Sequence, residues 1–269
     1  MSSLGSHESI RYVALGDSFT EGVGDVDQAR PNGVRGWADR VAEQFMLADP
    51  QAQYANLAIR GRLLGQILDE QVDAALELKP NLVSIYGGGN DILRPNVDID
   101  ALMRRYDTAI EKLRSAGLQV FTFTNMDVRD FNTFKHTRQR SALYNELLRE
   151  IVDKHELILV DYWRMRDFSD WRYWSSDRLH MNAAGHIKMA GRVLETLSHD
   201  RGSLMEAPIP EALNYTRMQL IRENGRWTRE FVMPWIGRRL RGTSSGDGLE
   251  PKYSQLMRFD IEPEVFHGR

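Results

Sequence analysis

Short apolar runs of strand length alternate with longer helical patterns from residue 11 to about residue 199, and this alternation limits the folds open to the chain. Such a rhythm is typical of βαβ units, in which parallel strands form a sheet that helices cover. We therefore predict an α/β fold with a five-stranded parallel sheet. The expected strands cover residues 12–15, 54–58, 82–86, 120–124 and 157–160, and the expected helices cover residues 35–48, 63–78, 99–116, 137–154 and 182–197.

The character of the chain changes at about residue 200. With 269 residues, of which 42% are hydrophobic, the chain can bury one full core and leaves roughly 70 residues outside it. We expect one domain over residues 1–199 and a C-terminal extension over residues 200–269. The longest apolar cluster of the extension, residues 231–236, is too small to fold alone. The extension should therefore pack on the domain or on a second subunit, which would make the protein a homo-oligomer.

Net charge and cysteine content exclude several classes of protein. A formal charge of −3 and an isoelectric point near 6.2 give no overall attraction to nucleic acid or to anionic lipid. Because the chain has no cysteine, disulfides, thiolate metal sites and a cysteine nucleophile are excluded. The first 11 residues lack a basic stretch followed by an apolar one, and no apolar run approaches the length of a membrane span. We expect a cytoplasmic protein with no nucleic-acid partner and no stable membrane insertion.

Four short segments follow the ends of the expected strands, and the outermost of them are 162 positions apart, from residue 18 to residue 180. In open parallel sheets, ligands lie beyond the carboxyl ends of the strands, where the loops carry the chemistry. We therefore expect the four segments to meet at one edge of the sheet. They are Gly16-Asp17-Ser18-Phe19, Gly61, Gly88-Gly89-Asn90-Asp91 and Asp177-Arg178-Leu179-His180.

The residue types in these segments match the parts of a serine hydrolase site. Ser18 is the candidate nucleophile, His180 the candidate base, and Asp177 the carboxylate that would orient the imidazole. The backbone N–H groups of Ser18 and Gly61 and the side-chain amide of Asn90 are candidate donors to an oxyanion. Taken singly, Ser18 could instead cap a helix, and Gly61 could be a glycine at the start of a helix with no further role. Their joint position at one sheet edge favours the catalytic interpretation.

Two details refine this hypothesis. Asn90 follows three glycines, a run that is costly in backbone entropy and hard to justify by packing, which favours a functional role for this segment. His186 lies six residues after His180, but no third ligand has suitable spacing, so we expect no metal site.

Candidate substrate contacts come from two places. Asp17 directly precedes the candidate nucleophile, and Trp174 belongs to an aromatic stretch before Asp177 that could form the wall of an acyl or sugar pocket. Ordinary aromatic packing under a loop is an equally good interpretation of that stretch.

A basic segment lies in the extension. Residues 225–241 hold five arginines and one glutamate, a local charge of +4, beside Trp227, Phe231 and Trp235. A lid, a subunit contact and a weak lipid-surface contact are all compatible with this pattern. We favour a lid or a subunit contact, because Pro234 should interrupt the amphipathic helix that a lipid contact needs.

Residues 11–199 resemble the SGNH hydrolases, also called the GDSL esterase/lipase family, whose four catalytic residue types would here be Ser18, Gly61, Asn90 and His180. The first segment has Phe19 where the family name has leucine, and residues 56–61 keep the family's Asn-x-x-x-x-Gly spacing, with Arg60 as an unusual neighbour. The resemblance implies a flavodoxin-like three-layer α/β/α fold, no cofactor, and hydrolysis of carboxylic or thio esters through an acyl-serine intermediate. It does not extend beyond about residue 200.

Three other functions stay open. The same residues permit acyl transfer to a sugar or alcohol, and a hydrolase scaffold can serve as a non-catalytic module that binds acylated ligands. A flavin or nucleotide binder would use residues 87–89 as a phosphate loop, but the lysine and hydroxyl residue of a P-loop do not follow them. The sequence does not specify the acyl chain or the alcohol of a small-molecule ester substrate.

Overall fold

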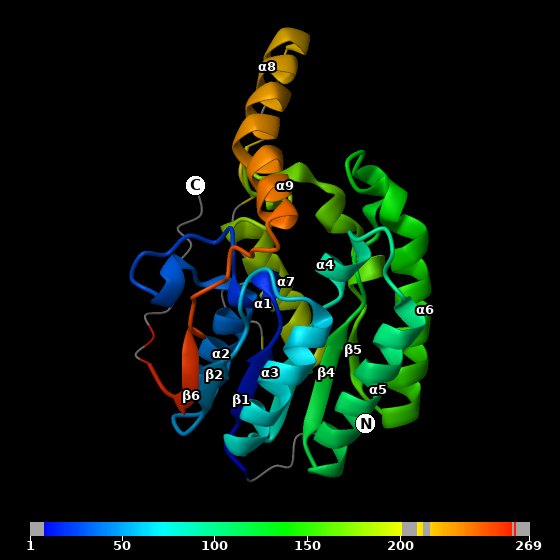
Figure 1. Cartoon of the computed structure of the whole chain (residues 1–269). Coiled ribbons are helices and arrows are strands. Elements are labelled where there is room, and N and C mark those ends of the chain that lie inside the picture. Colours follow the sequence, from blue (N-terminus) through cyan, green and yellow to red (C-terminus); the bar gives the residue numbers. More distant parts are fainter. Residues whose placement is uncertain (1–7, 201–208, 212–215, 260, 262–269) are drawn as a thin grey trace.

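The computed structural model describes residues 8–200, 209–211, 216–259 and 261. Within them, a six-stranded sheet with the strand order β5-β4-β3-β1-β2-β6 forms the centre of the molecule (Figure 1). β2 lies on one side of β1, and the chain then crosses to β3 on the other side, which creates the switch point where ligands of such sheets bind. The strands are β1 Arg11–Leu15, β2 Gln53–Asn56, β3 Leu82–Ile85, β4 Gln119–Phe123, β5 Ile158–Val160 and β6 Tyr253–Met257.

The expectation of five parallel strands is wrong in one respect. The five expected strands form and are parallel, but β6 adds a sixth strand that runs antiparallel to β2 at the edge of the sheet. Its pairing includes an irregularity between Tyr54 and Asn56. A short edge strand needs one apolar face at most, and β6 exposes Ser254 and Gln255, so it lacks the apolar run that identified the buried strands.

The expected helices of the sheet domain form close to their predicted positions, as the bounds of α2, α3, α5, α6 and α7 show. Shorter helical turns occupy the loops between them. The α-helices are α1 Ser18–Glu21, α2 Gly36–Ala48, α3 Leu64–Glu77, α4 Gly89–Ile92, α5 Ile99–Ser115, α6 Arg138–His155, α7 Ala183–Thr196, α8 Arg217–Trp227 and α9 Met233–Leu240; the 3₁₀ turns are η1 Pro31–Gly33, η2 Val128–Asp130, η3 Lys135–Thr137, η4 Tyr162–Arg164, η5 Arg166–Ser169 and η6 Trp171–Tyr173, and η8 Thr228–Val232 is a π-helical turn.

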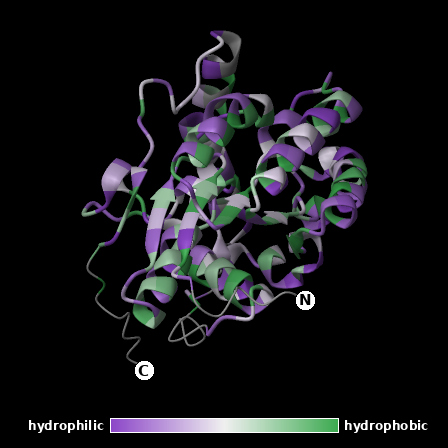
Figure 2. Cartoon of the chain, turned by 90° about the horizontal axis from the view of Figure 1, so that it is seen from below, coloured by the Kyte–Doolittle hydropathy of each residue, from purple (hydrophilic) through white to green (hydrophobic). Residues whose placement is uncertain are grey.

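Helices cover both faces of the sheet and complete three layers. Side chains alternate along β1, so that Tyr12 and Ala14 enter the core beneath α2 and α7, whereas Val13 and Leu15 enter the core beneath α3, α5 and α6. Figure 2 shows green and purple turns on the same helices, as expected for amphipathic helices on a sheet. The structure is the predicted α/β/α sandwich.

Part of the extension belongs to this sandwich. We call residues 249–257 the C-terminal anchor, because they carry β6 and the buried Lys252. The Lys252 ammonium lies 2.7 Å from Asp39 Oδ2 on α2 and also donates to the carbonyl oxygens of Val34 and Arg35. The anchor is therefore tied to the sheet and to the start of α2. The proposed division of the chain at residue 199 stays a prediction.

A second part of the extension, residues 217–240, is the helical arm. It projects beyond the edge of the sheet where β1 and β3 end (Figure 1). We expected Pro234 to interrupt an amphipathic helix, yet α8 continues through the π-helical turn η8 into α9. Since proline removes an amide donor and crowds the preceding turn, a wide turn just before it lets the helix continue.

None of the helices among the described residues combines the length and the apolar character that crossing a membrane requires.

Candidate active site

Ser18 is held at the first position of α1, directly beyond the end of β1. The helix is capped by Asp17 and not by Ser18, because the Asp17 carboxylate accepts the N–H of Phe19 at 3.0 Å. The Ser18 hydroxyl therefore does not cap the helix, and it lies 3.0 Å from Nε2 of His180. The interpretation of Ser18 as an N-cap residue is wrong, and its side chain faces the imidazole across 162 positions of sequence.

Asp177 holds the other side of the imidazole. Its Oδ2 lies 2.6 Å from Nδ1 of His180, while Oδ1 accepts the hydroxyl of Ser175 and the N–H groups of Leu179 and His180. Burial opposes ionisation of this carboxyl, but the hydrogen bond and the charge of His180 outweigh it, so the pKa of Asp177 lies well below its usual range. The carboxylate fixes the tautomer that leaves Nε2 to accept the Ser18 proton.

The loop that carries these two residues is a tight turn. Arg178, between them, adopts a φ of 58°, in the left-handed region that residues with a Cβ rarely enter. The turn is closed by the Ser175 N–H, which donates to the His180 carbonyl at 2.9 Å. A strained backbone at this position brings a carboxylate and an imidazole three residues apart into direct contact.

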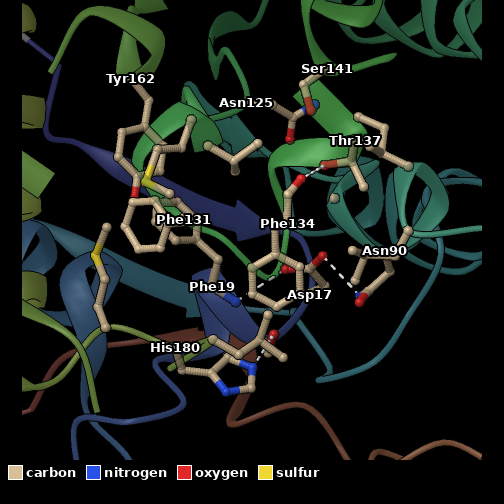
Figure 3. A pocket seen from close by; sticks show the side chains of 18 of the residues that line it. Asp17, Phe19, Asn90, Asn125, Phe131, Phe134, Thr137, Ser141, Tyr162 and His180 are labelled. Atoms are coloured by element: carbon tan, nitrogen blue, oxygen red, sulfur yellow. Dashed lines mark hydrogen bonds between the residues drawn. The ribbon is translucent and has the colours of Figure 1, made fainter. Parts of the chain in front are cut away.

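Asn90 is the second residue of α4, which follows β3. Its amide donates to the carbonyl of Arg62 at 3.0 Å. It also donates to Oδ2 of Asp17 at 3.3 Å (Figure 3). Burial raises the pKa of Asp17 to about 7, against the opposing effects of the Phe19 N–H and of His180. Asp17 and Asn90 therefore lie together on the wall that also carries Ser18.

The glycines before Asn90 have packing reasons that sequence reasoning missed. A Cβ on Gly88 would lie 2.6 Å from the ring of Tyr144, and a Cβ on Gly87 would lie 2.8 Å from Ile67. Gly88 also adopts a φ of 94°. The expectation that packing does not explain this run is therefore wrong, and the run gives no independent support for a function of Asn90.

Gly61 takes a different position from the other predicted residues. A Cβ there would lie 2.1 Å from Oγ of Ser244, and Gly61 does not line the cavity that contains Ser18. Within the described part of the chain, the N–H groups of Gly61 and Ser18 donate to no acceptor. Arg60, the unusual neighbour, forms an ion pair with the buried Glu21 at 2.6 Å and so fixes this loop against α1. The oxyanion role of Gly61 stays a prediction.

A cavity of about 160 Å³ opens beside Ser18, and its wall is mostly apolar. Figure 3 shows the rings of Phe19, Phe131, Phe134 and Tyr162 and the imidazole of His180 among the side chains that line it. Trp174 also contributes to the wall, where its indole N–H donates to the Phe168 carbonyl, so its position permits the predicted substrate contact. That contact itself stays a prediction.

Sequence reasoning missed the loop after β4, which supplies a large part of this wall. Its contributions include Asn125, Met126, Phe131 and Phe134. The rule that placed the other segments, that loops after parallel strands reach the ligand, applied equally to this loop. Asn125 is of special interest, because its Nδ2 is buried and has no partner within the described residues, whereas its Oδ1 accepts the hydroxyl of Tyr86.

His186 does not form a metal site with His180. Its Nδ1 accepts the N–H of Trp37 at 3.1 Å, and its Nε2 faces the carbonyl of Val23 at 3.3 Å, which is the pattern of a neutral buried imidazole. Burial lowers the pKa of His186 to about 4. No group of three or more metal-ligating acidic, histidine or cysteine side chains occurs among the residues that the structure describes.

The chain has a match among the models of known protein families. The model of the GDSL-like lipase/acylhydrolase family matches residues 14–187, which is more than half of the chain. The chain therefore belongs to the GDSL-like lipase/acylhydrolase family, a family of carboxylic ester hydrolases. The helical arm and the C-terminal anchor lie outside the matched residues.

Solved structures share this fold. An α/β hydrolase called LAE5, from the metagenome of Lake Arreo in Spain, is 20% identical and has a TM-score of 0.60, with 70% of this chain and 95% of that chain covered. The acetylxylan esterase Axe2 from Geobacillus stearothermophilus is 17% identical with a TM-score of 0.59, and the match covers 72% and 96% of the two chains. The acetyl xylan esterase AlAXEase is 18% identical with a TM-score of 0.57, covering 69% and 98%. A search of curated proteins gave no match.

Proposed function

We propose that this protein hydrolyses carboxylic or thio esters of small or acylated substrates through an acyl-serine intermediate. The observation that carries the proposal is the continuous contact from Ser18 Oγ to His180 Nε2, at 3.0 Å, and from His180 Nδ1 to Asp177 Oδ2, at 2.6 Å. Both distances lie within the range that proton transfer between a nucleophile and its base requires. The apolar cavity beside Ser18 supports an acyl group as the bound portion.

The reaction follows from these positions. Ser18 Oγ attacks the ester carbonyl as its proton passes to His180 Nε2, and the carbonyl oxygen becomes an oxyanion. When the adduct collapses, the ester C–O bond breaks and the leaving oxygen takes the proton from His180. Water then attacks the acyl-serine with His180 again as base, which releases the acid and restores the hydroxyl.

The oxyanion would be held by the Ser18 N–H and by the side chain of Asn90, with the Gly61 N–H as the third predicted donor. The Asn90 amide already uses one hydrogen on Arg62 at 3.0 Å, and its bond to Asp17 at 3.3 Å is long. An oxyanion would replace that longer bond. Because burial raises the pKa of Asp17 to about 7, a proton on Asp17 near neutral pH would reduce the repulsion between its carboxyl group and the oxyanion.

A panel of p-nitrophenyl esters of increasing chain length tests the proposal. We expect turnover by the wild-type protein, loss of nearly all turnover in Ser18→Ala, and a decrease of about 10²–10³-fold in kcat for Asn90→Ala. Trapping of an acylated Ser18 by mass spectrometry would identify the intermediate. Full activity of Ser18→Ala, or no turnover of any ester or thioester by the wild-type protein, would contradict the proposal.

A further inference from the structure

A second pocket adjoins the cavity of Ser18 and meets it at His180. It encloses about 150 Å³, and it shares Leu93, Phe134, Leu179 and His180 with the first cavity. Ser18 and Asn90 line the first cavity only. The imidazole therefore stands between two pockets, of which one contains the nucleophile and the other does not.

The helical arm supplies one wall of this second pocket. Trp227, Phe231 and Val232 face Leu93, Phe134 and Leu179 of the sheet domain across it. Six of the ten residues that line the pocket are thus apolar, which favours an apolar occupant. The wall depends on the arm, because three of these six apolar residues come from it.

Direct contacts to the loop between Ser175 and His180 fix the position of the arm beside His180. The indole N–H of Trp227 donates to the carbonyl of Asp177 at 2.7 Å, and the Arg178 guanidinium donates to Oδ1 of Asn224 at 2.7 Å. That guanidinium also lies 5.2 Å from the centre of the Trp227 ring. The same loop therefore positions both the imidazole and the pocket wall.

Proton transfer decides which part of an ester belongs in this pocket. His180 Nε2 must reach the leaving oxygen to protonate it, so the alcohol portion of the ester must lie beside the imidazole. The acyl portion stays bonded to Ser18 and belongs in the first cavity. We propose that the second pocket, completed by the helical arm, binds the apolar alcohol portion of the ester substrate, an alkyl or aryl group; this inference rests on the proposed function.

The alcohol preference that follows differs from the names of two matched solved structures, which are acetyl xylan esterases. The arm lies outside the matched residues 14–187, so the wall formed by Phe231 and Val232 is a feature of this chain that the family model does not cover. Most of the hydroxyl groups of a sugar would face the six apolar side chains, because only Thr133, Asp177, His180 and Arg238 offer polar groups, and an unpaired hydroxyl is unfavourable.

The test compares two acetate esters that differ only in the alcohol, hexyl acetate and methyl acetate, with hydrolysis followed by acid release. Phe231→Ala removes part of the wall, and Phe231→Trp fills the pocket. We expect each variant to lower the ratio of kcat/KM for hexyl acetate to kcat/KM for methyl acetate by about tenfold. The control is Met233→Ala, two residues further along the arm and exposed outside the pocket, which should leave the ratio unchanged.

A binding measurement separates failure of this inference from failure of the proposed function. Hexan-1-ol should bind the Ser18→Ala protein, detected by calorimetry, and should bind about tenfold more weakly when Phe231→Ala is added. If no ester is hydrolysed but this difference in binding is found, the second pocket binds an alkyl alcohol, whereas the hydrolase proposal and the role of the pocket in ester cleavage fail. An equal loss of kcat/KM for both esters, or equal binding of hexan-1-ol by both proteins, would overturn the pocket assignment.

Discussion

The C-terminal anchor and the helical arm belong to one extension, yet they differ in how far their side chains are buried. The anchor buries Lys252 and Tyr253 against the sheet and α2, whereas the arm leaves Met218, Ile221 and Met233 between 57% and 60% exposed. The anchor thus behaves as part of the core of the sandwich. The arm contacts the loop of Asp177 through Trp227 and Asn224 and lines a pocket at His180, so its contribution is to the site. Position in the sequence alone does not separate structural from site-forming segments.

The largest expected effect is on the anchor. Lys252→Met removes one partner of a fully buried ion pair and leaves the Asp39 carboxylate without its counter-charge, so we expect a loss of about 3–5 kcal/mol in the free energy of unfolding. Urea denaturation measures this loss. The double variant Lys252→Met with Asp39→Asn should recover part of it. A loss below about 1 kcal/mol would mean that the anchor does not support the core as described.

The stability of the folded protein should also depend on pH through the buried His186 of α7. Burial lowers the pKa of His186 to about 4 in the folded protein, helped by the charges of Arg40 and Lys252. Because the unfolded chain binds a proton at this imidazole below its ordinary pKa, stability should fall as the pH falls from about 6.5 to about 4. The expected contribution is about 3 kcal/mol across this window.

Urea denaturation at several pH values checks this, with His186→Gln as the comparison. The slope between pH 6.5 and 4 should be smaller in the variant by about 1.4 kcal/mol per pH unit. The arm contains no histidine, so it adds no such dependence of its own. Identical slopes in the two proteins would show that His186 is not kept neutral by its surroundings.

A smaller effect is expected where the arm meets the loop of Asp177. Trp227→Phe keeps an aromatic ring but removes the hydrogen bond from the indole N–H to the Asp177 carbonyl, which should weaken docking of the arm by about 1 kcal/mol. Trypsin should then cut the arm about fivefold faster under conditions where cleavage follows local opening. Global unfolding in urea should not change. Unaltered cleavage would indicate that this hydrogen bond does not hold the arm.

The smallest effect is expected on the outer side of the arm. Met218→Ser combined with Ile221→Ser replaces two exposed apolar side chains, and the free energy of unfolding should change by less than about 0.5 kcal/mol. Thermal denaturation of the double variant beside the wild type measures this. A large loss would mean that these side chains are covered by another part of the chain or by a second copy in solution.

The sequence predicted the sheet domain and most of the candidate site, for identifiable reasons. Buried parallel strands such as β3 are continuous apolar runs, and the loops that follow them carry recognisable groups such as Ser18, Asn90 and His180. β6 escaped prediction because an edge strand with polar residues has no such run. The position of Phe131 and Phe134 in the cavity wall was not predicted, because in the sequence aromatic loop residues look like ordinary core residues.

The sequence did not predict that the arm forms a wall of a pocket. Its placement depends on contacts between residues far apart, such as Trp227 with Asp177 and Arg178 with Asn224, and no local pattern encodes them. The expected break at Pro234 was wrong because local propensity rules describe an ordinary α-helix, whereas the chain uses a π-helical turn at this point.

The π-helical turn Thr228–Val232 sets the rotation of α9 relative to α8. An α-helix advances by about 100° per residue, so a single residue added to or lost from residues 228–232 would rotate α9 by roughly that angle relative to α8. Insertions and deletions at this one point could thus present a new set of side chains to the molecule while the segment that touches Asp177 keeps its phase. Length variation there would change the chemistry of the arm more abruptly than point substitution does.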